Sequence, residues 1–344
     1  MAICCAWTNR KRHRPLALCA ALFVLTLLLG GCHREKEVCQ TCGDDIAPPV
    51  GLAFSIPSGD AAFFSLSAPH VIRTMPLTNV AVIAADINAS GYVAVVEASA
   101  DALRIYRLPR LEFLGGIHVG GTVEDVAMHP NNTTAFGLTR NGNLWRYTLG
   151  SDTPDTLGLR LFPHRITLRP PDDTQAWIAC PASNVIQIAD LFSPGIRDSV
   201  VIHVPSDVQF SANGHLAYIG SKGDSGTVFE YNTDDRRFSR SIRVGTGPFE
   251  LAVSRDDRYV AAADSAGHAV HFWDLSNEQT WSVPLGGVGG RVHFAQGTPP
   301  VCFVLVRNLS MVKRVEISGA APHVTDSLQL EFTVGDFVLW ENAP

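Results

Sequence analysis

Charged residues are scarce in this chain. Asp, Glu, Lys and Arg make up 17% of its 344 residues, whereas hydrophobic residues make up 46%, which excludes a disordered or collagen-like chain. Methionine is also rare, with 4 residues against 17 Phe, 29 Gly and 21 Pro, and this composition favours strands and turns over long helices. The formal net charge is −6. A nucleic-acid partner is not expected, because that function needs a basic surface.

The motifs of the common enzyme classes are missing as well. The sequence has no GxSxG, HExxH or P-loop motif, and no GxGxxG that opens a helix. Paired aspartates such as Asp234-Asp235 fall in polar turns, where turn chemistry explains them better than acid–base catalysis. The sequence therefore gives no positive sign of catalysis.

Residues 1–31 have the parts of a secretory signal peptide. The basic run 10–14 precedes the apolar run Pro15–Leu29, and two small residues, Gly30 and Gly31, follow. The apolar run is shorter than the roughly 20 residues of a membrane-spanning helix. We expect this segment to direct secretion and then to be cleaved, so it is not part of the fold.

The signal peptide ends on Leu29-Gly30-Gly31-Cys32, which resembles the lipobox of bacterial lipoproteins. That resemblance implies cleavage before Cys32 and acylation of its thiol and new amine, and several acyl chains anchor a protein firmly. By similarity to enterobacterial lipoproteins, His33 in place of Asp implies the outer membrane, on its periplasmic or surface face. The alternative is an ordinary signal peptide with a chance cysteine.

A flexible tether is expected at 32–49. Its Cys39-Gln40-Thr41-Cys42 favours a local disulfide, since Gly43 breaks the CxxCH haem pattern and the chain has no second CxxC for a zinc ribbon. The alternative is that Cys39 and Cys42 bind a metal or take part in redox chemistry. Cys180 and Cys302 lie in apolar strands and are expected to be buried.

After residue 50 the chain repeats a strand–turn–strand–turn–strand pattern. The spacing of corresponding turns is 41, 41, 41, 43 and 42 residues, the length of one four-stranded β-propeller blade. These turns lie at Ala89, Pro130, Pro171, Ala212, Arg255 and Gly297.

One copy, VGTGPFELAVSRDDRYVAAADSAGHAVHFWDL at 244–275, resembles the YVTN-type propeller repeat of bacterial surface proteins. The other copies match more loosely. The resemblance covers residues 50–344 and implies a single all-β propeller domain. It is specific for fold and weak for function.

Strand direction predicts seven four-stranded blades, with six or eight as alternatives. Three N-terminal strands at 52–57, 61–67 and 70–76 precede the first full repeat, and a lone strand, DFVLWE at 336–341, follows the last. We expect this C-terminal strand to be the innermost strand of the blade that the N-terminal strands begin. Closure of the ring in this way would protect a sheet edge.

The innermost strands share a polar residue where each strand begins. Propeller strand entrances converge on one mouth of the central channel, so these residues predict a ring of mixed charge, with Glu124 and His164 beside it. The residues are Asn79, Asp125, Arg165, Asp207, Glu250, Arg291 and Asp336. A solvated structural ring, a binding site and a catalytic site are the three interpretations. No metal site is predicted, because a hard cation disfavours the competing arginines.

We expect a lipid-anchored, non-catalytic binding or scaffold protein of the bacterial cell envelope, with a protein, glycan or small-molecule partner. The alternative is a lactonase-like hydrolase, because YVTN-type repeats resemble those of lactonase propellers. Its active site would combine Asp207, Glu250, Arg165 and His164 at the channel mouth. No cofactor is predicted, since the tryptophans do not form the docking repeat of quinoprotein propellers.

Overall fold

The computed structural model describes residues 46–98, 101–160, 162–193, 195–223, 226–318 and 321–341, without the side chain of Phe249. The expected signal peptide, Cys32, Cys39 and Cys42 lie outside these residues. A compact unit spans Asp44–Pro344. Within it, Ile46 is already buried in the hydrophobic core, so the end of the segment expected as a tether belongs to the folded unit.

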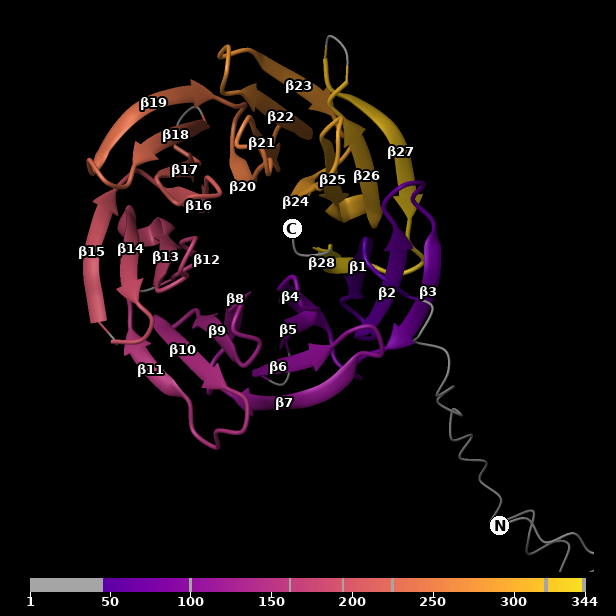
Figure 1. Cartoon of the computed structure of the whole chain (residues 1–344), viewed down its shortest axis with the longest axis vertical. Helices are drawn as coiled ribbons and strands as arrows, with labels where there is room; N and C mark the ends of the chain where they lie inside the picture. Colours follow the sequence, from indigo (N-terminus) through magenta and orange to yellow (C-terminus); the bar gives the residue numbers. More distant parts are fainter. Residues whose placement is uncertain are drawn as a thin grey trace, which may run out of the picture. The chain divides into compact units, whose positions relative to one another are not determined.

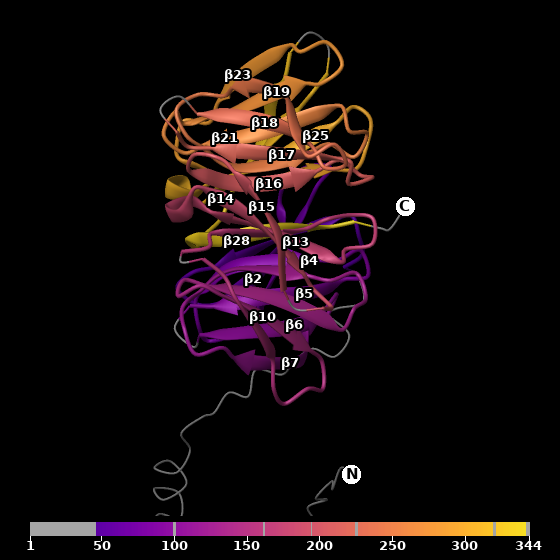
Figure 2. The ribbon, with the colours of Figure 1, turned by 90° about the vertical axis from the view of Figure 1, so that its left-hand side faces the viewer.

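This unit is a seven-bladed β-propeller, as the repeat length and strand directions predict. Each blade is a four-stranded antiparallel sheet, and the seven sheets surround a central channel (Figure 1). Figure 2 shows the same ring from its side. We number the blades along the chain, starting with the blade that combines the first and last strands.

Each blade is described by its strands in order from the channel outward. Blade 1 consists of β28 (Val334–Trp340), β1 (Val50–Ser55), β2 (Asp60–Ser65) and β3 (Val71–Pro76). Blade 2 consists of β4 (Val82–Ile87), β5 (Tyr92–Glu97), β6 (Ala102–Arg107) and β7 (Glu112–His118). Blade 3 consists of β8 (Val123–Met128), β9 (Thr134–Thr139), β10 (Asn143–Thr148) and β11 (Asp155–Gly158). Blade 4 consists of β12 (Arg165–Leu168), β13 (Gln175–Cys180), β14 (Val185–Asp190) and β15 (Gly195–Val201). Blade 5 consists of β16 (Pro205–Phe210), β17 (Leu216–Ser221), β18 (Thr227–Asn232) and β19 (Arg237–Arg243). Blade 6 consists of β20 (Pro248–Val253), β21 (Tyr259–Asp264), β22 (Ala269–Asp274) and β23 (Thr280–Pro284). Blade 7 consists of β24 (Gly289–Ala295), β25 (Val301–Val306), β26 (Met311–Glu316) and β27 (His323–Gln329). Two 3-10 turns, η1 (Pro181–Ser183) and η2 (Arg307–Leu309), follow β13 and β25.

The C-terminal strand closes the ring in the predicted way. β28 pairs antiparallel with β1, and the register partners run from Val50↔Trp340 to Phe54↔Asp336. Phe337 and Val338 are fully buried there. The innermost strand of blade 1 therefore comes from the opposite end of the chain to the other three strands.

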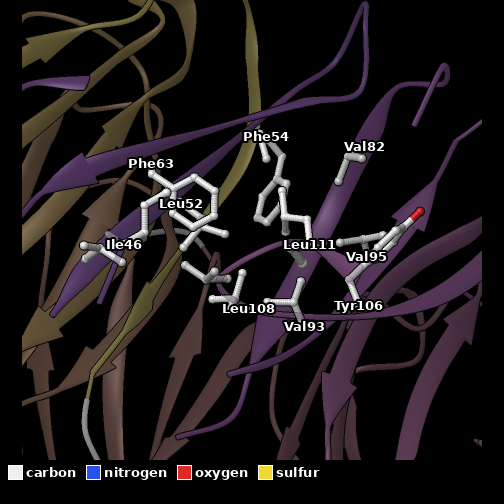
Figure 3. Packing of buried hydrophobic residues seen from close by; sticks show 14 residues of the cluster. Ile46, Leu52, Phe54, Phe63, Val82, Val93, Val95, Tyr106, Leu108 and Leu111 are labelled. Atoms are coloured by element: carbon white, nitrogen blue, oxygen red, sulfur yellow. The ribbon is translucent and has the colours of Figure 1, made fainter. Parts of the chain in front are cut away.

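Hydrophobic cores fill the junctions between blades. Alternate side chains of a strand point to opposite faces of its sheet, so each blade contributes to two cores. In β1, Leu52 and Phe54 pack against blade 2 (Figure 3), whereas Ala53 packs against blade 7. Seven such clusters are present, one for each junction.

Two further features bear on function. Cys180 and Cys302 are free, buried thiols on β13 and β25, as expected. Within the described ranges, no helix is long and apolar enough to cross a membrane.

Candidate binding cavity in the central channel

A β-bulge in the innermost strand of most blades orients its polar side chain toward the channel. In six blades the register between the innermost strand and its neighbour shifts beside the same strand position, as between Val123 and Asp125. A bulge redirects the side chain next to it. The residues at this position form what we call the channel ring: Asp125, Arg165, Asp207, Glu250, Arg291 and Asp336.

Asn79 is not part of the channel ring. It is exposed in a bend ahead of β4, and Val82 begins that strand. The bulge of blade 2 precedes Ala84, so the ring position lies five residues later than the sequence alignment placed it. Blade 2 thus contributes a methyl group where the other six blades contribute a charge.

Three ring aspartates hydrogen-bond to the next blade. Each accepts a peptide N–H from the channel edge of that blade's innermost strand, where no further strand pairs. The N–H groups of Ile166, Leu251 and Ala85 donate to Asp125 Oδ2, Asp207 Oδ2 and Asp336 Oδ2 at 3.0, 2.8 and 2.9 Å. These contacts, which we call edge clamps, satisfy backbone groups that no further strand can pair.

Ion pairs join the ring across the channel. Arg165 donates to Glu250, two blades away, and to Asp125 Oδ1 at 3.1 Å. Arg307, from η2, donates to Glu250 Oε1 at 3.1 Å. Glu250 is 1% exposed, so its carboxylate is shielded from solvent.

Arg291 joins the other side of the ring. Its Nε and Nη2 donate to Asp336 Oδ1 and Oδ2 at 2.8 and 2.6 Å, and Nη2 also donates to Ala85 O at 3.3 Å. Asp125 Oδ1 and Glu250 Oε2 each lie 3.5 Å from this guanidinium. The ring is therefore a buried, cross-linked ion network, in contrast to the solvated ring that was one of the expectations.

Burial and charge set the pKa values here. Burial opposes ionisation of Glu250, but Arg165 and its neighbours outweigh burial and lower the pKa of the Glu250 carboxyl. For Asp207, burial dominates over Arg165 and raises the pKa to about 7. Burial, helped by Arg165, lowers the pKa of His164 to about 3 and that of Lys222 to about 8.

A cavity of about 360 Å³ adjoins the ring inside the channel. Its lining includes three ring residues, Asp125, Glu250 and Arg291, and extends to Pro130 and Asp173 in the turns after β8 and β12. The usable space therefore extends from the ring toward the strand ends, away from the mouth where the sequence placed the site.

A second layer of polar residues lines this cavity. They lie two residues after the ring position, and are Asp86, Thr167, Gln209 and His293. All four are partly accessible, and small residues at the same position, Ala127 and Ala252, leave the space open. Sequence reasoning missed this layer, although the period of two in a strand places it on the same face as the ring.

Asp86 is the distinctive member of the second layer. Its Oδ2 accepts the N–H of Met128 in blade 3 at 2.8 Å, an edge clamp shifted by two residues from the ring position. Burial raises the pKa of the Asp86 carboxyl to about 7. Burial and Arg291 lower the pKa of His293 to about 4, so its imidazole is neutral at pH 7. The Nε2 of this imidazole carries the proton, because it donates to Phe337 O.

Comparison with known proteins supports the fold. No family model and no curated protein matches the chain. A crystal structure of a functionally unknown protein from Desulfotomaculum acetoxidans superposes with a TM-score of 0.72 at 15% sequence identity. The match covers 86% of this chain and all of that one. This likeness extends to the fold alone.

Proposed function

We propose that this protein is a lipid-anchored β-propeller of the bacterial cell envelope that binds a ligand in its central channel without transforming it. The observation that carries the binding part is the cavity of about 360 Å³, whose size lies within the range of ordinary small-molecule sites, about 300–1,000 Å³. The charged groups of the channel ring beside it make hydrogen bonds and ion pairs between blades. They are therefore poorly placed to take part in a reaction.

The proposed anchor rests on the sequence Leu29-Gly30-Gly31-Cys32. We expect Cys32→Ser to move the protein from the membrane fraction to the soluble fraction, because only a cysteine thiol can carry the thioether-linked lipid. Metabolic labelling with a fatty acid, followed by fractionation, tests this. Undiminished label in the variant would refute the anchor and leave the binding proposal standing.

Binding is tested by identifying what the purified full-length protein carries. Small molecules released on denaturation are identified by mass spectrometry, for the parent and for Thr167→Val with Gln209→Leu. These substitutions remove hydrogen-bonding groups from the cavity wall at similar side-chain volume, and we expect the released ligand to be lost. Gln279→Leu, at an exposed position beside β23, is the matched control. Equal recovery from all three proteins would place binding outside the channel.

A lactonase-like hydrolase is the second candidate, and Asp86 favours it. A cavity carboxyl with a pKa of about 7 suits a general base at neutral pH. The residues expected from the sequence suit catalysis less well. Glu250 is held by arginines, and a pKa of about 3 makes His164 a weak base. Lactone hydrolysis by the parent that is lost in Asp86→Asn would establish this alternative in place of simple binding.

A further inference from the structure

The charges beside the cavity do not balance. Three guanidinium groups, those of Arg165, Arg291 and Arg307, lie against an equal number of carboxylates. These carboxylates are Asp125, Glu250 and Asp336. Lys222 acts on Asp207 and Glu250 as a fourth cation, and the acids Asp86, Asp173 and Asp207 lie in the ring or on the cavity wall, so acids exceed cations by two. Burial raises the pKa of two of these acids, Asp86 and Asp207, to about 7.

Of these two acids, only Asp86 lines the cavity. Asp207 turns away from it, because its oxygens accept the N–H groups of Val208 and Leu251, each at 2.8 Å. The carboxyl of Asp86 uses Oδ2 for the N–H of Met128, and the residue is partly accessible within the cavity. Its negative charge can therefore be met by something that enters the cavity.

Hydrogen-bond donors on the cavity wall are largely occupied. The Nε and Nη2 of Arg291 donate to Asp336 and Ala85, and the amide nitrogen of Gln209 lies 3.4 and 3.5 Å from the Asp207 oxygens. The Nε2 of His293 donates to Phe337 O at 3.1 Å.

Acceptors on the same wall remain available. They are the amide oxygen of Gln209 and the Nδ1 of neutral His293. Glu250 Oε2 accepts no hydrogen bond and lies 3.5 Å from Arg291 Nε, but it is buried, so it contributes negative charge beside the wall and not an acceptor that a ligand can reach. A ligand that fits this wall brings donors and positive charge.

Resting on the binding function proposed above, we propose that the cavity takes a small organic cation, a primary amine in its ammonium form, with the ammonium against Asp86. An ammonium has three donors and no acceptor, which matches the acceptor surplus. A bare divalent metal ion fits less well, because it needs several oxygen ligands and Arg291 stands on the wall as a competing cation.

Proton release accompanies this binding. The charged groups that act on Asp86 are Arg291 from β24 and Asp125 from β8, together with the N–H groups of Met128 and Ile87, while Asp173 and His293 also line the cavity. Below pH 7 the carboxyl holds a proton, which a bound ammonium displaces. Affinity therefore rises with pH through about 7 and levels off above it. From pH 6 to pH 8 the ionised fraction of Asp86 grows about tenfold, and the affinity should follow it.

The experiment uses isothermal titration of the full-length protein with putrescine, and with 1,4-butanediol as the uncharged analogue of the same length. We expect putrescine to bind about tenfold more tightly at pH 8 than at pH 6, and the diol to bind at least tenfold more weakly. Asp86→Asn should weaken putrescine binding and remove its pH dependence. Asp152→Asn, at an exposed position, should leave both unchanged.

Thr167→Leu is a second variant, which fills the cavity and keeps Asp86, and it should also abolish binding. This variant tests the proposal if Asp86→Asn does not fold. Equal affinity for the amine and the diol, a pH-independent affinity, or no amine binding in the parent would overturn the proposal. In that event, the broader binding proposal would still stand if the parent releases a ligand that the Thr167→Val, Gln209→Leu protein does not. If nothing is released either, both proposals fail.

Discussion

In the channel, single aspartates accept backbone N–H groups that a neighbouring strand would otherwise pair. Asp125, Asp207 and Asp336 each accept a peptide N–H from the channel edge of the next blade. The innermost strands have no partner on that side, and a buried N–H without an acceptor costs about 1–3 kcal/mol. The ring residues thus have a structural role that their pattern of charge did not reveal.

Replacement of Asp125 by Ala should destabilise the fold by about 3 kcal/mol, because it removes one buried partner of Arg165 and the acceptor for the N–H of Ile166. Chemical denaturation measures the change. Asp152→Ala, at an exposed position, is the control and should stay within about 0.5 kcal/mol of the parent. A similarly small change at Asp125 would mean that the ring is solvated after all.

The stability of Asp207→Asn relative to the parent should increase with pH. Folding raises the pKa of Asp207 from 3.8 to about 7, so the parent loses stability from this carboxyl as pH rises between these values. Asn does not titrate, and its loss of one acceptor is a constant cost. The relative gain is at most about 1.4 kcal/mol per pH unit. Denaturation from pH 4 to pH 8 tests this, and parallel stability curves would contradict it.

At the residue scale, the sequence was informative where the repeat was regular. Aligned strands identified all six channel-ring residues, but the alignment placed Asn79 in the position that belongs to Ala84. The link between β3 and β4 has no glycine, whereas glycines mark the starts of β8, β20 and β24. Burial of the ring could not be read from the sequence, because it depends on partners from blades that are distant in the chain.

Individual strands could be predicted from their direction better than from their similarity. Residues 61–77 align on 92–108, which contain the second and third strands of blade 2. In the structure, β2 and β3 are instead the third and fourth strands of blade 1. Direction succeeds because a short link can only join strands whose adjoining ends lie on the same side of the ring.

Deletion of residues 336–344 should lower the stability by several kcal/mol. It removes Phe337 and Val338 from the core, and a large buried apolar side chain contributes about 1.5–3 kcal/mol. It also exposes an edge of β1. Thermal melting measures the effect, and deletion of 342–344 is the control. A shortened protein that melts at the parent temperature would show that β28 is dispensable.

The ring as a whole depends on a junction that no covalent bond crosses. Because Val50 and Trp340 are register partners, a two-residue Asn-Gly turn can join the chain between Glu341 and Pro49. We expect a circular permutant of the propeller with new ends between His118 and Val123, where blades 2 and 3 meet, to melt at or above the temperature of the unpermuted propeller 49–341, which lacks the same N-terminal residues. Each blade is then continuous in sequence.

The matched control places the new ends between Thr139 and Asn143, inside blade 3, and it should melt at a lower temperature because it divides a blade. Equal melting temperatures for the two permutants would show that blade continuity does not contribute to stability. The blade length could be predicted from the 41–43-residue period, and the blade count, and so this design, from strand direction. The cavity could not, because it depends on how small residues such as Ala127 and Ala252 face one another across the channel.

The position of β1 has a mechanical consequence. Although it is the first strand of the propeller, it lies inside its sheet, between β28 and β2. A force that enters through the N-terminal segment therefore pulls along a strand held by two ladders of hydrogen bonds. Both ladders are loaded in shear and must yield together, whereas an edge strand would unzip one bond at a time. A propeller that is tethered by its N-terminus and pulled through a ligand should therefore resist force well at this end.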